Sequence, residues 1–262
     1  MNHSLADKHA LVCGASEGIG RAAAIALAEL GASVTVLARR QVKLQELVDQ
    51  LPRPNARQQH AWIAADVTDI DALRTQVGAL AEQRPVQVLV NNTAGPPGGA
   101  AHSALPETYL EVFRQHLVAN QVLLQCVLPG MREARFGRIV NIISTSVKEP
   151  IANLGVSNTI RGAVASWAKT LASELGPDGI TVNNVLPGYT RTQRLEQILA
   201  ERARATGKDE AAIAAAMLAT VPAGRFAEAA EIAAAVAFLC TPDAAYVNGI
   251  NLPVDGGRTR SL

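Results

Sequence analysis

The sequence predicts a single α/β domain built on a doubly wound parallel sheet of about seven strands. Three observations lead to this fold class. Short apolar segments alternate with helical segments along the chain, which is typical of parallel strands covered by helices on both faces. Hydrophobic residues make up 48% of the 262 residues, enough for a large core. No linker, repeat or low-complexity segment interrupts the alternation, so we expect one domain over residues 1–262.

The first part of the chain is expected to contribute four strands. Short apolar runs predict them at residues 9–13, 33–37, 61–64 and 86–90, joined by right-handed crossovers. Helices are predicted at 19–30, 41–50 and 70–82, the first directly after a glycine-rich turn. Pro52, Pro54 and Asn55 mark a loop before the third strand.

The second part continues the alternation, with strands predicted at residues 138–143, 180–185 and 249–254. A Gly/Pro-rich loop precedes a long helix at 108–133, and another long helix follows at 155–175. Further helices are predicted at 193–205, 209–220 and 228–239. Residues 188–226 are expected to form a helical lid over the carboxyl ends of the strands, where open α/β sheets bind ligands.

Charge and hydropathy exclude several classes of protein. The formal net charge is +1, and Lys and Arg are spread along the chain, so neither nucleic acid nor a membrane surface is an expected partner. No apolar run approaches the ~20 residues that span a bilayer, and the first residues do not resemble a secretory signal. Cys13, Cys126 and Cys240 are widely spaced in apolar stretches. We expect buried thiols, a cytoplasmic protein and no metal site.

A glycine-rich turn joins the first predicted strand to the first helix. Residues 14–20 read Gly-Ala-Ser-Glu-Gly-Ile-Gly. Glycine allows the backbone to turn tightly and approach a diphosphate closely, and the helix that follows presents free N–H groups with a partial positive charge. The turn therefore predicts a dinucleotide site, formed by Gly14, Ser16, Glu17, Gly18, Ile19 and Gly20.

The spacing Gly-x-x-x-Gly-x-Gly resembles that of the short-chain dehydrogenase/reductase family. Three further segments resemble the same family: Asp-Val at 66–67, Asn-Asn-Thr-Ala-Gly at 91–95 and Pro-Gly-Tyr-Thr-Arg-Thr at 187–192. Gly-Arg at 224–225 and Val-Asp-Gly-Gly at 254–257 also match. The resemblance implies a Rossmann fold and a nicotinamide dinucleotide cofactor. The further cofactor contacts that it implies are Asp66, Val67, Asn92, Ala94, Arg161, Pro187, Gly188 and Thr192.

The end of the second strand bears on the choice between NAD and NADP. An acidic residue there would bind the ribose diol of NAD, but this chain has Ala38 followed by Arg39 and Arg40. An arginine at this place can pair with the 2′-phosphate of NADP, and we expect Arg39 to do so. Glu17 argues for NAD, because many NADP-binding relatives carry a basic residue before the second glycine. The sequence favours NADP and leaves NAD open.

The resemblance also implies the positions of the catalytic residues, and most of those residues are replaced. Enzymes of this family use Asn, Ser, Tyr and Lys. The matching positions hold His116, Ser144, Ser157 and Arg161, with Asn120 a rival for the first and Ser146 for the second. Because residues i and i+4 share a helix face, Ser157 and Arg161 are both expected to point into the site.

Ser157 cannot be expected to replace the missing phenol, because an alkyl hydroxyl is a far weaker acid than a phenol of pKa ~10. Three explanations stay open. Another group could be the acid, with His116 the first choice and Lys148 and Tyr189 the others. A water held by Ser144 and Ser157 could relay the proton. The reaction could also have been lost or changed.

These replacements resemble a divergent branch of the family. Its members are similar to 3-oxoacyl-acyl-carrier-protein reductases, lack the Tyr and Lys, and carry Asn-Asn-Thr-x-Gly-Pro-Pro at the place of residues 91–97. The branch implies an NADP- or NAD-dependent oxidoreductase that acts on a carbonyl or an alcohol. The alternative function is a cofactor-binding protein with little turnover, serving as a sensor or an oligomer subunit.

Substrate and assembly are predicted more coarsely. Residues 211–221 are mostly apolar, which favours an apolar small-molecule substrate under the lid. Relatives pair through two long helices, here predicted at 108–133 and 155–175, and through the last strand. We therefore expect a homotetramer or a dimer.

Overall fold

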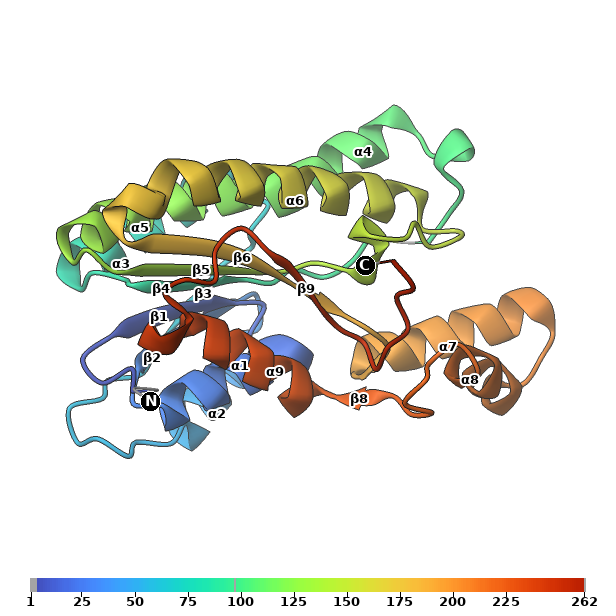
Figure 1. Ribbon diagram of the computed structural model, residues 1–262, viewed down its shortest axis with the longest axis horizontal. Helices are drawn as coiled ribbons and strands as arrows, with labels where there is room; N and C mark the ends of the chain where they lie inside the picture. The colour runs from blue at the N-terminus through green and yellow to red at the C-terminus, as the bar shows by residue number, and fades with distance from the viewer. Residues whose placement is uncertain (1–3, 97, 262) are drawn as a thin grey trace.

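The computed structural model describes residues 4–96 and 98–261, and its centre is one seven-stranded sheet (Figure 1). The strand order is β3-β2-β1-β4-β5-β6-β9, and every pairing between neighbours is parallel. The strands are β1 (His9–Cys13), β2 (Ser33–Ala38), β3 (Ala61–Ala64), β4 (Val88–Asn91), β5 (Gly137–Ile142), β6 (Ile180–Pro187) and β9 (Asn251–Val254). The predicted fold class, a single-domain Rossmann fold, is confirmed.

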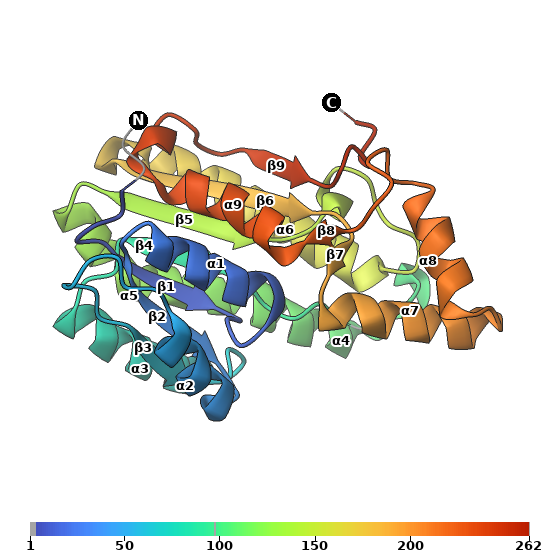
Figure 2. The same cartoon turned by 90° about the horizontal axis from the view of Figure 1, so that it is seen from below.

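Helices cover both faces of the sheet (Figures 1 and 2). One face carries α1 (Gly18–Glu29), α2 (Gln41–Gln50) and α9 (Ala229–Cys240), and the other carries α3 (Ile70–Gln83), α5 (Ala119–Glu133) and α6 (Gly155–Leu175). Side chains alternate between the two faces, as they must in a strand. In β1, Ala10 and Val12 join one buried cluster, while Leu11 and Cys13 join the other.

The helix predicted at 108–133 is divided into three parts. It consists of α4 (Pro106–Phe113), a π-helical segment (Arg114–Val118) and α5. A π-helical turn inserts one extra residue into the helical repeat and often lies at a functional site. The apolar periodicity of the sequence does not reveal such an insertion, because helical pieces continue on both sides of it. His116 lies within the π-helical segment.

The predicted lid is attached to the body by a small parallel ladder. Thr190 in β7 (Thr190–Arg191) pairs with Ala227 in β8 (Ala227–Glu228). Between these strands lie α7 (Gln193–Thr206) and α8 (Glu210–Leu218), which project from the end of the sheet toward which the strand arrows point (Figure 2). The two-residue strands were not predicted, because so short a segment has no pattern of alternation.

A row of asparagines crosses the sheet from β4 to β9, and three of them, Asn91, Asn141 and Asn184, are buried. Asn91 Nδ2 donates to Asn141 Oδ1 at 2.8 Å, and Asn141 Nδ2 donates to Asn184 Oδ1 at 2.9 Å. Asn184 Nδ2 donates in turn to Asn251 Oδ1 at 2.8 Å. These residues are direct partners in the strand register, so each amide lies beside the next.

Within residues 4–96 and 98–261, no helix combines the length and the hydrophobicity needed to cross a bilayer.

All three cysteines are free thiols; Cys13 and Cys240 are buried, whereas Cys126 is only partly buried. Burial raises the pKa of Cys13 and of Cys240 to about 12, so both are neutral residues of the core at ordinary pH.

Candidate active site

A cleft of about 1000 Å³ lies at the carboxyl ends of the strands, where the connections after β1 and β4 run in opposite directions. Open α/β sheets bind their ligands at this switch point. Most of the residues selected from the sequence line it: Gly14, Ser16, Glu17, Gly18, Ile19, Arg39, Asp66, Val67, Asn92, Ala94, Ser144, Ser157, Arg161, Pro187, Gly188 and Thr192. Gly20 and His116 lie behind this lining.

The glycine turn after β1 is packed too closely for side chains. Gly14 has a φ of +60°, and a Cβ there would lie 2.5 Å from the carbonyl oxygen of Asn92. A Cβ on Gly20 would overlap the carbonyl oxygen of Gly14. Asn92 Nδ2 donates to that same oxygen at 3.2 Å, which fixes the turn against the end of β4.

The start of α1 is available to an anion. Its N-cap residue, Glu17, has an extended backbone with φ −165°, and its side chain does not cap the helix. The first turn of α1 contains no acidic residue. The N–H groups of that turn therefore keep their partial positive charge toward the cleft. The close glycine packing and the uncapped helix together fit the diphosphate of a dinucleotide.

Basic side chains surround two carboxylates at the end of the cleft next to β2. Arg40 Nη2 lies 2.5 Å from Glu17 Oε2 and donates to Ser16 Oγ at 3.2 Å. Lys43 Nζ lies 3.7 Å from the same Glu17 oxygen. Arg39 is more exposed and lies 4.0 Å from Asp66. The sequence named Arg40 beside Arg39 but favoured Arg39 for the 2′-phosphate. Lys43 was not named, although its position near the start of α2, after β2, is the available signal.

Ser157 and Arg161 lie one turn apart on α6, and both are buried. Arg161 Nη1 donates to the carbonyl oxygen of Ile142 at 2.9 Å, at the end of β5. Burial lowers the pKa of Arg161 to about 10, so its guanidinium still carries a positive charge at neutral pH. Ser144 follows β5, and its Oγ accepts a hydrogen bond from the Ser146 N–H at 3.1 Å.

His116 lies behind the cleft. Its Nδ1 is 2.5 Å from Thr93 Oγ1, and its Nε2 is buried without a hydrogen-bond partner in the described part of the chain. Burial, and then the positive charge of Arg161, lower the pKa of His116 to about 3. The imidazole is therefore neutral at pH 7 and has no acidic proton to give in that range. Its rival Asn120 is buried at the start of α5.

The other candidates from the sequence have different surroundings. Tyr189 lines the cleft, with its ring edge-on to Phe226 and with Arg258 4.7 Å from the ring centroid. Lys148 follows the short helix η3 (Thr145–Val147) and is not part of the cleft lining. Ser146 is buried outside that lining. Pro97, in the Gly/Pro-rich loop, lies outside the described residues.

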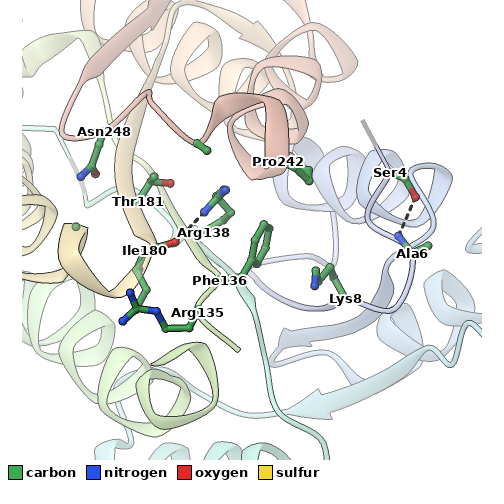
Figure 3. A pocket seen from close by; sticks show the side chains of 13 residues that line it. Ser4, Ala6, Lys8, Arg135, Phe136, Arg138, Ile180, Thr181, Pro242 and Asn248 are labelled. Carbon is green, nitrogen blue, oxygen red and sulfur yellow. Dashed lines mark hydrogen bonds between the residues drawn. The ribbon is translucent and has the colours of Figure 1, made fainter. Parts of the chain in front are cut away.

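A second pocket, of about 660 Å³, lies at the amino ends of β5 and β6 (Figure 3). Arg138, Phe136 and Thr181 contribute to its lining, and the guanidinium of Arg138 lies 4.1 Å from the ring centroid of Phe136. None of the residues selected from the sequence lines it. The glycine turn and the uncapped helix face the larger cleft instead, so that cleft is the candidate active site.

Comparison with known proteins extends over almost the whole chain. A family model described as enoyl-(acyl carrier protein) reductase matches residues 14–259. The 3-oxoacyl-acyl-carrier-protein reductase FabG of Vibrio cholerae is 35% identical over 257 residues, which cover 97% of this chain and 98% of that protein.

Two solved structures are similar throughout. YwfH, an NADPH-dependent reductase involved in bacilysin biosynthesis, has a TM-score of 0.92 and 28% identity, covering 97% of this chain and 99% of its own. The L-sorbose reductase from Gluconobacter frateurii, in complex with NADPH and L-sorbose, has a TM-score of 0.92 and 27% identity, covering 100% of both chains.

Proposed function

The chain belongs to the short-chain dehydrogenase/reductase family, and from that premise we propose that it is an NADP(H)-dependent oxidoreductase acting on a carbonyl or alcohol substrate. One observation carries the proposal: the turn at Gly14–Gly20 and the uncapped start of α1 form a diphosphate cradle in the same cleft as Ser144 and Arg161. The NADPH-dependent YwfH and the NADPH complex of L-sorbose reductase support the choice of NADP.

Each region of the cleft has a distinct role toward the cofactor. Gly14, Ser16, Gly18, Ile19 and Gly20 would hold the diphosphate, Asp66 and Val67 the adenine, and Arg39 the 2′-phosphate. The nicotinamide half would lie against Asn92, Ala94, Arg161, Pro187, Gly188 and Thr192. Glu17 would influence the cofactor indirectly, because its carboxylate partly neutralises the positive charge of Arg40. When bound, the reduced cofactor supplies the hydride that a carbonyl carbon accepts.

The chain's own residues must stabilise and protonate the carbonyl oxygen. Ser144 would position that oxygen and donate a hydrogen bond to the negative charge that develops on it, while the fixed charge of Arg161 would favour anionic groups in this part of the cleft. Ser157 is short and borders the cleft, so it would hold a water that delivers the proton. His116, which is neutral and hydrogen-bonded to Thr93, would position the loop after β4 and would not donate a proton. On these substitutions we propose that the chain belongs to the divergent branch without Tyr and Lys.

The alternative is a cofactor-binding protein with little turnover. It is favoured by the loss of the phenol at position 157, since the one phenol in the described lining of the cleft, that of Tyr189, lies on the loop after β6 and packs against Phe226 and Arg258. In that case the lid of residues 188–226 would report nucleotide binding to a partner or to another subunit.

Nucleotide titration followed by turnover assays tests the proposal. We expect NADPH to quench or enhance protein fluorescence with an affinity about tenfold higher than that of NADH. A panel of ketones and oxo acids should then support NADPH oxidation, followed at 340 nm. Absence of binding by both nucleotides contradicts both functions, whereas tight NADPH binding without oxidation across the panel favours the alternative.

A further inference from the structure

The substrate half of the cleft has a net positive charge, and we infer that the substrate carries a carboxylate that binds between Arg161 and Arg194. The inference rests on the proposed function and adds the chemical class of the substrate. Both arginines line the cleft, from α6 and from the first turn of α7. It adds to the expectation of an apolar small-molecule substrate, because the cleft would then select a molecule that has an apolar body and an anionic group.

Arg161 has an unused hydrogen-bonding edge. It is only 7% exposed, and its one hydrogen bond in the described part of the chain runs from Nη1 to Ile142. Nε is buried without a partner, and Nη2 donates to no described residue. The Nε and Nη2 protons point in the same direction, which is the edge of a guanidinium that binds a carboxylate through two parallel hydrogen bonds.

Arg194 reaches the same short segment of the chain as Arg161. Its Nη2 donates to the carbonyl oxygen of Pro96 at 3.1 Å. A Cβ built on the neighbouring Gly95 would lie 4.0 Å from Arg161 Nη2. The guanidinium of Arg161, from the body of the domain, and that of Arg194, from the lid, therefore both lie near residues 95–96.

No carboxylate in the described lining balances these two charges. The acidic residues of that lining are Glu17 and Asp66, and their carboxylates pair with Arg40 and Arg39 rather than with Arg161 or Arg194. A buried cation without a counter-charge is unfavourable, so an anion that enters this half of the cleft is bound strongly. Leu154 and Ile198 also line the cleft and provide apolar surface for the rest of the substrate.

Matched pairs of probes separate the carboxylate from the carbonyl. The probes are 2-oxohexanoate and 5-oxohexanoate, each against its methyl ester, with NADPH oxidation as the readout. For the oxo acid that is turned over, we expect kcat/KM at least about 30-fold above that of its ester. Equal turnover of acid and ester would overturn the inference while leaving the proposed function intact.

A binding measurement tests the inference in a way that does not depend on turnover. Hexanoate and hexanamide are titrated calorimetrically into the protein, with and without NADPH. We expect binding of hexanoate at least about tenfold tighter than that of hexanamide, and a loss of this preference in Arg194→Gln. Arg161→Gln should lose the preference in the same way. Because Arg161 is buried, its replacement disturbs folding more readily, so Arg194→Gln is the preferred variant. Arg57→Gln, an exposed arginine paired with Asp7, is the matched control. Failure of hexanoate to bind in either state, or unchanged binding by Arg194→Gln, overturns the inference.

Discussion

His9 and His116 are both buried among neutral or positively charged groups, and this fixes their protonation state. His9 Nε2 lies 2.8 Å from Thr35 Oγ1 and also 2.8 Å from Arg84 Nη2. Burial, and then the charge of Arg84, lower the pKa of His9 to about 4. Since His116 is lowered to about 3 by burial and by Arg161, both imidazoles are neutral in the folded chain at pH 7.

This predicts a loss of stability in mild acid. The unfolded chain binds protons at these histidines from pH 6.5 downward, whereas the folded chain does so only near pH 4 and below, so the free energy of unfolding falls as the pH falls through that window. Each buried histidine contributes a slope of about 1.4 kcal/mol per pH unit. Urea unfolding at pH 6.5, 5.5 and 4.5 measures it. Glu231, whose pKa is lowered to about 2 chiefly by its hydrogen bond with Arg225, titrates below this range.

The histidine prediction has a direct control. His116→Asn should show a shallower pH dependence than the natural chain, whereas His102→Asn, at an exposed position, should not. An equal slope in the natural chain and in His116→Asn would show that His116 is protonated to the same extent in both states.

The proposed cofactor site predicts that Glu17 controls the charge offered to the 2′-phosphate. Its carboxylate faces Arg40 and Lys43 from one side. Replacement by Gln removes a negative charge and leaves both cations to the phosphate. We predict that Glu17→Gln raises NADPH affinity by about three- to fivefold, the size expected of an exposed pair, and leaves NADH affinity unchanged. Fluorescence titration at low and high salt measures it, and the gain should shrink at high salt. A parallel gain for NADH would refute the explanation.

At the scale of elements, the sequence predicted what depends on apolar periodicity and on glycine. Runs such as residues 9–13 and 155–175 have a clear pattern, and the structure places a strand and a helix there with the same bounds. The π-helical segment and the β7–β8 pair were missed, because neither changes that pattern. The row of asparagines was also missed, since its signal appears only when the strand register aligns Asn91, Asn141 and Asn184.

At the candidate site, too, the sequence predicted local patterns but not contacts between segments that are far apart in the chain. The glycine turn was found from its residues, because only glycine fits so close to Asn92 and Gly14. The resemblance placed Ser157 and Arg161 on one face of α6, where they lie. Arg194 was not selected, because its contact with Pro96 joins segments 98 residues apart.

The asparagine row predicts a large effect of one substitution. Asn141 is fully buried, donates one side-chain hydrogen bond and accepts another. Asn141→Leu would leave Asn91 Nδ2 and Asn184 Oδ1 buried without these partners, so we expect a loss of about 3 kcal/mol in the free energy of unfolding. Urea denaturation measures it. Asn251→Ala, at the end of the row, breaks one of these bonds and should cost about 1 kcal/mol. Similar costs for both variants would contradict the explanation.

Two helical glycines offer a matched pair. A Cβ at Gly20 in α1 would collide with Gly14, so Gly20→Ala should distort the turn and reduce NADPH affinity by more than about tenfold. Gly78 in α3 has no neighbour within 4 Å of an added Cβ. Gly78→Ala should therefore retain the affinity and gain about 0.5–1 kcal/mol of stability. Titration of both variants with NADPH measures the two affinities. Full affinity in Gly20→Ala would argue against a diphosphate site at Gly14–Gly20.

At the scale of the whole molecule, most of the large apolar side chains that remain exposed in the described residues belong to two separate stretches of the chain. Leu105, Leu110 and Phe113 lie in and before α4, with exposures of 67%, 70% and 38%. Phe238 in α9 and Tyr246 before β9 form the other region, with exposures of 44% and 103%. A chain that pairs with copies of itself through two different surfaces forms a tetramer with two kinds of two-fold interface.

We therefore predict that the chain is a tetramer of four times its 27.5 kDa mass in light scattering. A charge introduced into one region should leave the other interface intact, so Leu110→Glu and Tyr246→Glu should each give dimers, and the double variant monomers. Val42, an apolar residue of α2 that is 71% exposed and lies outside both regions, provides the control, and Val42→Glu should remain a tetramer. A natural chain that is monomeric at micromolar concentration would contradict the assembly, and dissociation by Val42→Glu as well would show that the two regions are not the interfaces.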